Sequence, residues 1–155
     1  MMTLASDVIT RLRGKTLATA ESCTGGGIGA ALTAVSGASA VYKGGIISYC
    51  NEIKHGLLGV SAELLDTVGA VSAPVAEAMA LGARNALNVS IAVSVTGLAG
   101  PGGDEYGNPV GTVFIGYSDE NVTFARHFQF SGSREEIRNQ AVTRALQLIL
   151  NQNSQ

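Results

Sequence analysis

The sequence predicts an α/β fold, a three-layer α/β/α sandwich whose mixed sheet includes one antiparallel hairpin. Segments with strand character alternate along the chain with segments of helical periodicity, which is typical of a sheet covered by helices on both faces. Two strand-like segments, 111–117 and 122–130, are separated by only four residues and therefore predict a hairpin. The 155 residues, 46% of them hydrophobic, suffice for one core, so residues 1–155 are expected to form a single domain.

The first half of the chain alternates between helices and strands. Apolar residues at helical spacing predict a first helix over 3–13. A second helix carries Ile28, Leu32 and Val35 on one face, and Thr24 is its expected N-cap. The other predicted elements of this half are a strand at 16–20, a strand within 42–49, a helix at 51–58 and a helix at 61–68.

A longer helix is expected to start at Ser72, because Pro74 falls in its first turn, where proline is tolerated. Val75, Met79 and Ala86 are expected on its buried face. The segments that follow are a strand over 89–95 and a long loop over 96–109.

The last helix, after the hairpin, has a clear start signal. Ser133 and Glu136 have the spacing of a capping box, in which each side chain accepts a hydrogen bond from the backbone of the other residue. The residues expected to be buried on this helix are Ile137, Ala141, Ala145 and Leu148.

Composition excludes several functional classes. A net charge of −2 and an aromatic content of 5% provide no basic surface and little base stacking, so we expect no nucleic-acid partner. No apolar run has the length of a membrane span, and the N-terminus lacks a signal-peptide pattern. Cys23 and Cys50 could form at most one disulfide, so a cytoplasmic protein with reduced cysteines is expected. Two histidines and two cysteines without ligand spacing predict no metal site.

The charged residues indicate an oligomer. They make up 14% of the chain, whereas an average soluble domain has about 25%. A small chain with so little charge is expected to cover part of its surface by self-association, as a homodimer or a larger homo-oligomer.

Two glycine-rich turns, at 21–27 and 96–103, follow predicted strands. Ligands of open α/β sheets bind beyond the carboxyl ends of the strands, where backbone N–H groups and a helix N-terminus can hold an anion. The alternative is that the glycines only turn the chain and that Thr24 only caps a helix. Neither turn has the lysine of a Walker A phosphate-binding motif.

Ser22 is the candidate nucleophile, because it is expected at a strand end beside a helix N-terminus. Its hydroxyl needs a base. Lys54 could accept its proton if burial lowered the pKa of the amine, and Tyr49 could relay that proton or orient the amine. Composition alone favours the alternative that Lys54 is a solvated helix lysine and Tyr49 a rim tyrosine. His127 is expected in a hairpin strand, and His55 is expected to point elsewhere from its helix.

Four other residues leave alternatives open. Cys23 is a rival nucleophile, although no histidine is placed to pair with it, so a small buried neighbour is expected. Glu21 could bind substrate or form a salt bridge. Arg134 and Arg138 lie near a helix N-terminus, where cations are unfavourable, and therefore indicate an anion nearby. That anion could be a ligand phosphate, but the glutamates in the same turn favour a structural role.

The motifs of this sequence resemble those of the CinA C-terminal domain family. The resemblance extends from about residue 8 to residue 150. Ala-Glu-Ser-Cys-Thr-Gly-Gly at 20–26 is similar to the first motif of the family, and Tyr-Cys-Asn-Glu-Ile-Lys at 49–54 is similar to the second. Gly-Ala-Val-Ser at 69–72 is similar to the third. The loop at 96–103, together with Pro-Val-Gly-Thr-Val at 109–113, resembles the long loop and strand of the family.

The resemblance implies an α/β/α sandwich that deamidates nicotinamide mononucleotide, the PncC activity of pyridine nucleotide salvage, without a metal or another cofactor. It implies that Ser22 is the nucleophile, Lys54 its base and Tyr49 an assisting hydroxyl, with oxyanion donors near Thr24 and Gly25. This reverses the interpretation of Lys54 from composition. The substrate-binding residues implied are Thr24, Gly25, Gly26, Asn51, Thr96, Gly97, Ala99, Gly100, Pro101, Gly102 and, for the phosphate, Arg138.

Two departures from the family accompany the resemblance. Many relatives carry an additional N-terminal domain, which this chain is expected to lack together with its activity. The loop at 104–108 contains two carboxylates and lacks the lysine that relatives often have before 109–111, which changes its electrostatics toward a phosphate. The alternative function is a catalytically silent nucleotide-binding module that acts through a protein partner, although such a module has no need of Ser22, Tyr49 and Lys54.

Overall fold

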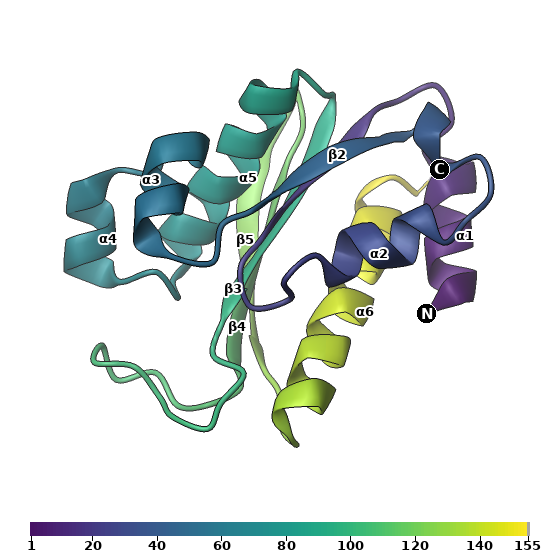
Figure 1. Ribbon diagram of the computed structural model, residues 1–155. Coiled ribbons are helices and arrows are strands. Elements are labelled where there is room, and N and C mark those ends of the chain that lie inside the picture. The colour runs from purple at the N-terminus through teal and green to yellow at the C-terminus, as the bar shows by residue number, and fades with distance from the viewer. Residues whose placement is uncertain (155) are drawn as a thin grey trace.

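The computed structural model describes residues 1–154 as a five-stranded mixed sheet between two layers of helices, which confirms the predicted fold class (Figure 1). The strand order is β2-β1-β3-β4-β5. The first three strands of that order are parallel, and the last two pairings are antiparallel. The strands are β1 (Leu17–Glu21), β2 (Tyr42–Ile47), β3 (Ile91–Gly97), β4 (Thr112–Ser118) and β5 (Thr123–Gln129).

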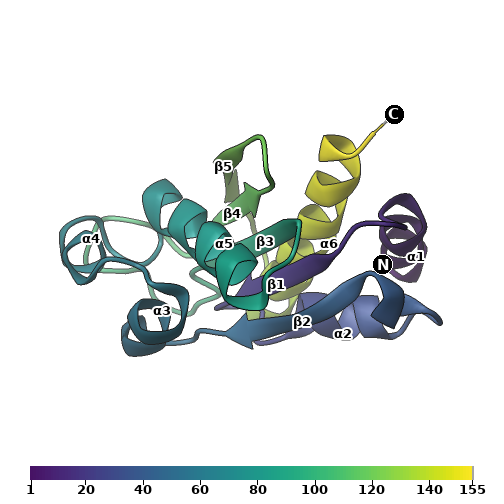
Figure 2. The same cartoon turned by 90° about the horizontal axis from the view of Figure 1, so that it is seen from above.

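The helices cover both faces of the sheet. Helices α1, α2 and α6 pack together on one face, whereas α5 packs on the other and carries α3 and α4 on its outer side (Figure 2). Among residues 1–154, no helix combines the length and the apolar character needed to cross a bilayer. The helices are α1 (Met2–Arg11), α2 (Gly27–Thr33), the 3-10 helix η1 (Ala38–Ala40), α3 (Asn51–Leu58), α4 (Ala62–Val68), α5 (Ala73–Leu87) and α6 (Arg134–Gln152).

Strand alternation divides the core between the two faces. In β3, Ile91, Val93 and Val95 face the larger cluster beneath α1, α2 and α6, whereas Ala92 faces α5. The side of the sheet that meets α5 carries small residues. A Cβ at Gly116 would overlap with the Ala76 carbonyl of α5, so α5 lies close to the sheet only because this position is glycine.

Most element positions agree with the sequence predictions, including the hairpin and the Ser133–Glu136 capping box. Three details of helix length and burial are wrong. Helix α2 ends at Thr33, so Val35 lies beyond it. Ala86 is exposed, because it lies in the last turn of α5 at an open groove against α3. Leu148 is only half-buried, and its neighbour Ile149 is buried instead.

Candidate active site

Ser22 and Lys54 form a buried hydrogen-bonded pair. The Lys54 Nζ donates to the Ser22 Oγ at 3.0 Å and to the Ser48 carbonyl at 2.8 Å. Lys54 is only 2% exposed, so the interpretation of this residue as a solvated lysine is wrong. Burial lowers the pKa of the Lys54 amine, although the nearby thiols of Cys50 and Cys23 act in the opposite direction. The amine therefore loses its proton more readily than a surface lysine does.

The sheet places the two residues of this pair next to each other. Strands β1 and β2 are parallel neighbours, so their carboxyl ends lie side by side at the same edge of the sheet. Ser22 directly follows β1, and its N–H donates to the Val95 carbonyl of β3 at 3.0 Å. Three residues separate the end of β2 from the start of helix α3, which carries Lys54 back over that edge. A Cβ at Gly82 would overlap with the Leu58 carbonyl, so this glycine allows α3 to pack closely on α5.

Glu21 holds the start of helix α2, in place of the N-cap predicted at Thr24. The Glu21 carboxylate accepts hydrogen bonds from the N–H groups of Ile28 at 2.8 Å and Gly29 at 3.0 Å. It also accepts one from the Thr24 hydroxyl at 2.7 Å. The N-cap position is Gly26, whose φ of 101° lies in the left-handed region. Glu21 is buried, so neither of the two roles considered for it, substrate ligand or salt-bridge partner, describes what it does.

A cavity of about 290 Å³ opens above the Ser22–Lys54 pair. Of the six substrate-binding residues predicted at 96–102, all except Pro101 line this cavity. Thr24, Gly25 and Gly26 are not among the residues that line it, and they lead from Ser22 into α2. The residues that line it are Ser22, Cys23, Tyr49, Asn51, Lys54, Ala70, Val71, Thr96, Gly97, Leu98, Ala99, Gly100, Gly102 and Arg134.

Arg134, which is absent from the predicted site, is the arginine of this cavity. Its guanidinium donates to the Tyr49 hydroxyl at 3.1 Å and to the Gly100 carbonyl. Arg138, predicted to bind the phosphate, instead donates to main-chain carbonyls and does not line the cavity. The Tyr49 side chain is 63% exposed, and among residues 1–154 its hydroxyl pairs with Arg134 rather than with Ser22 or Lys54.

Ala70, Val71 and Leu98 also line the cavity and were not predicted to do so. The first two lie in the Gly-Ala-Val-Ser segment at 69–72, so that motif was the signal that could have identified them. Leu98 lies within the glycine-rich loop between two predicted binding residues.

One expected detail of the chemistry changes with the structure. The Gly25 N–H donates to the Ser22 carbonyl at 3.1 Å and is not free to bind an oxyanion. The Thr24 N–H has no acceptor within residues 1–154. Cys23 is buried as expected, and burial raises the pKa of its thiol to about 11, so the thiol is protonated at neutral pH and is a poor nucleophile.

The remaining titratable residues lie away from this cavity or have structural partners. His55 Nδ1 hydrogen-bonds with the Val60 carbonyl at 2.7 Å, and His127 stacks on Phe114. Within the described chain, no group of three His, Cys, Asp or Glu side chains could hold a metal ion.

The loop at 104–108 borders a second recess, which shares Asn51, Ala70, Val71 and Leu98 with the cavity. Although partial burial acts against it, hydrogen bonds from Asn108 and Tyr106 hold the pKa of Asp104 below its usual value. The Tyr106 hydroxyl donates to the Asp66 carbonyl at 2.9 Å. The loop is therefore fixed beside the cavity, and both of its acidic residues are among those that line the recess.

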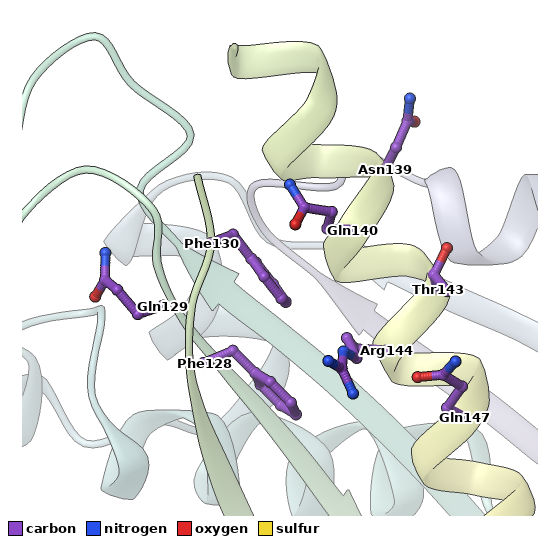
Figure 3. A pocket seen from close by; sticks show the side chains of 8 residues that line it. All are labelled: Phe128, Gln129, Phe130, Asn139, Gln140, Thr143, Arg144 and Gln147. Atoms are coloured by element: carbon purple, nitrogen blue, oxygen red, sulfur yellow. The ribbon is translucent and has the colours of Figure 1, made fainter. Parts of the chain in front are cut away.

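A larger cavity of about 560 Å³ lies between β5 and α6 (Figure 3). Figure 3 shows that Phe128 of β5 and Phe130, just beyond the end of that strand, approach it from one side, while Arg144 and several amide side chains approach from α6. It contains the hydroxyl of Thr143 and no histidine, lysine or carboxylate that could act as its base. Its size therefore does not make it the candidate catalytic site.

Comparison with known proteins identifies relatives of the whole chain. The family model of the CinA C-terminal domain matches residues 1–152. A CinA-like protein of Thermosynechococcus vestitus is 52% identical over 131 residues, which cover 82% of this chain and 32% of that protein. A CinA-like protein of Mycolicibacterium gilvum is 48% identical over 139 residues, which cover 89% of this chain and 33% of that protein. The chain thus spans about a third of the length of these curated relatives.

Solved structures agree with this comparison. A CinA superfamily protein from Klebsiella pneumoniae has a TM-score of 0.95 at 34% identity, over 98% of this chain and 96% of that chain. A competence/damage inducible protein from Agrobacterium tumefaciens has a TM-score of 0.95 at 40% identity, over 99% of this chain and 95% of that chain. The match of sequence and structure along the whole length shows that this chain belongs to the CinA C-terminal domain family.

Proposed function

We propose that this chain is a serine amidohydrolase that converts nicotinamide mononucleotide to nicotinate mononucleotide and ammonia, as the PncC-type members of its family do. The observation that carries the proposal is the 3.0 Å hydrogen bond between Lys54 Nζ and Ser22 Oγ, formed by a buried amine with a lowered pKa. A lysine that only stabilised the fold would have no need to lose solvent and face a serine hydroxyl in a cavity.

In this mechanism, the Ser22 Oγ attacks the carboxamide carbon, and its proton passes directly to the neutral Lys54 amine. The bond between the carbonyl carbon and the amide nitrogen then breaks. Lys54 returns the proton to the leaving nitrogen, which departs as ammonia. Water attacks the resulting Ser22 ester with Lys54 as base, which releases nicotinate mononucleotide and restores the hydroxyl.

The cavity suits a small anionic amide. Its volume of about 290 Å³ is at the lower end of the usual range for small-molecule sites, about 300–1,000 Å³. Arg134 provides a guanidinium at the mouth, and a guanidinium can bind two oxygens of a phosphate at once. We assign the phosphate to Arg134 rather than to Arg138. Tyr49, which holds Arg134 through its hydroxyl, then positions this arginine and does not relay the proton.

The test is release of ammonia from nicotinamide mononucleotide by the purified protein, measured with a chelator present. We expect equal amounts of ammonia and nicotinate mononucleotide. Ser22→Ala should lower kcat by about 10³-fold or more, as loss of a nucleophile does. Ser36→Ala replaces an exposed serine in a surface turn and is the matched control, with unchanged turnover.

Two results would count against this function. Near-normal turnover by Ser22→Ala would exclude Ser22 as the nucleophile. A folded wild-type protein that binds the nucleotide without releasing ammonia would favour the alternative of a nucleotide-binding module. Detection of a Ser22 ester by mass spectrometry would separate the two functions independently of the rate, because only the enzyme forms it.

A further inference from the structure

Arg138 holds the main chain immediately after the candidate nucleophile. Its Nε donates to the Cys23 carbonyl at 3.0 Å, and its Nη2 donates to the Thr24 carbonyl at 3.2 Å. Gly25 follows with a φ of 59°, and a Cβ at this glycine would lie 3.4 Å from the Arg138 Nη2. The half-buried guanidinium thus packs against bare backbone and spans two successive peptide groups.

We propose that Arg138 is a positioning residue, which orients and polarises the Thr24 N–H so that this group binds the oxyanion formed during attack by Ser22. This inference rests on the proposed function. A trans peptide directs its N–H opposite to its C=O. The Cys23 carbonyl points toward α6, so the Thr24 N–H of the same peptide points away from α6.

The Thr24 N–H points to the side of the sheet on which the reaction takes place. Helix α6 lies on one side of the sheet, whereas α3 lies on the other side and brings Lys54 to Ser22 (Figure 2). An N–H that points away from α6 therefore points to the side on which the Ser22 hydroxyl meets its base.

The neighbouring donor is already in use. The Gly25 N–H donates to the Ser22 carbonyl, whereas the Thr24 N–H has no acceptor in the described part of the chain. A hydrogen bond from a guanidinium to a carbonyl is charge-assisted, and it draws electron density from the peptide. That makes the N–H of the same peptide a better donor. Thr24 thereby gains what an oxyanion donor requires, namely a fixed orientation before the reaction and an increased positive charge.

A positioning role predicts different kinetics from a phosphate-binding role. Loss of a phosphate ligand weakens substrate binding and raises KM. Loss of oxyanion stabilisation lowers kcat and leaves KM nearly unchanged, because the negative oxygen exists only in the transition state and intermediate. Arg138 makes two bonds to the main chain and does not line the cavity, which favours the second pattern.

The first measurement is the steady-state deamidation of nicotinamide mononucleotide by Arg138→Ala and Arg138→Lys, with Arg144→Ala as the matched control. Arg144 lies on the same helix and faces the other cavity, so its loss should change neither constant. Removal of an oxyanion donor costs about 10²–10³ in kcat, and Arg138→Ala retains the donor without its support, so we expect a fall of about 10–10². KM should change by less than twofold, and added guanidinium ion should restore part of kcat. A raised KM with unchanged kcat would overturn the proposal.

The second measurement does not depend on the substrate. An alkyl fluorophosphonate reacts with an activated serine and develops negative charge on its phosphoryl oxygen, so the rate of Ser22 labelling reports the oxyanion site directly. We expect slower labelling of both Arg138 variants, and circular dichroism will show whether each is folded. If Arg138→Ala does not fold, the labelling rate of Arg138→Lys, which keeps a cation at this position, tests the proposal instead. An unchanged labelling rate in a folded variant would overturn the proposal.

The labelling experiment also separates this proposal from the proposed function. Wild-type protein that is labelled at Ser22 but does not deamidate the nucleotide would refute the proposed substrate only, and the rates of the Arg138 variants would still decide the role of Arg138. Wild-type protein that is neither labelled nor active would refute both.

Discussion

Replacement of Glu21 by glutamine is expected to weaken the fold at the start of helix α2, directly beside the candidate nucleophile. The carboxylate accepts three hydrogen bonds, two of them from backbone N–H groups of α2 and one from Thr24. In Glu21→Gln the side-chain oxygen can take the place of Oε1, which receives two of these bonds. The new NH₂ group then faces the Gly29 N–H, and two donors oppose each other.

The magnitude follows from the groups that lose their partners. A buried donor without an acceptor costs about 1–3 kcal/mol. Loss of a negative charge at a helix N-terminus costs a further amount of about 0.3–1 kcal/mol. Together these give a decrease of about 2–3 kcal/mol in the free energy of unfolding, with the upper limit near 4. For a chain of this length, each kcal/mol lowers Tm by about 2–4 °C, so a fall of about 5–10 °C is expected.

Urea and thermal unfolding followed by circular dichroism would measure this effect, with Glu63→Gln as control. Glu63 is also an acidic residue in the first turn of a helix, but it is exposed, so its replacement should change the free energy of unfolding by less than about 0.5 kcal/mol. A double-mutant cycle with Thr24→Val should show a coupling between the Glu21 and Thr24 side chains. If Glu21→Gln were as stable as the control variant, the carboxylate would not be what holds the start of α2.

Two further predictions concern Lys54 and the helix that carries it. The neutral amine is the base, so kcat/KM should rise with pH and level off at a pH below the ordinary Lys pKa of 10.5, because burial lowers the pKa of Lys54. A pH–rate profile that still rises steeply near pH 10.5, or substantial activity in Lys54→Arg, would contradict this. Gly82→Ala should place a methyl group against the Leu58 carbonyl, displace α3 and destabilise the fold by about 1–3 kcal/mol, with a loss of activity in the folded fraction. Gly56→Ala, where a Cβ would meet open space, is its control in both the unfolding and the activity measurements.

Local patterns were sufficient for most of the elements of this fold. The hairpin and the last helix could be predicted because their signals, four turn residues and a capping box, involve residues close together in sequence. The start of α2 could not, because its stabilising group is a carboxylate six residues before the first residue of the helix, at the end of the preceding strand. A capping rule that considers only the residues flanking a helix assigns this role to Thr24.

The candidate site was predictable in its residue types but not in its geometry. Ser22 and Lys54 are 32 positions apart, and they meet only because β1 and β2 are neighbours in the sheet, an order that no local pattern specifies. Arg134 and Arg138 are one helical turn apart on α6, so helical periodicity places both on one face. One guanidinium reaches the cavity and the other reaches the main chain of the nucleophile turn, and this difference arises from how α6 packs against α2.

The burial of Lys54 connects the stability of the protein with its proposed chemistry. Composition favours a solvated lysine because a charged ammonium loses hydration on burial. In this fold, the Ser48 carbonyl accepts a hydrogen bond from the amine, and once the amine is neutral its lone pair can accept the proton of the Ser22 hydroxyl across the same 3.0 Å contact. The same desolvation that makes this position unfavourable for a lysine lowers the pKa of the amine. Burial of Lys54 is costly for the fold. Its position opposite a serine in a cavity is therefore better explained by proton transfer than by packing.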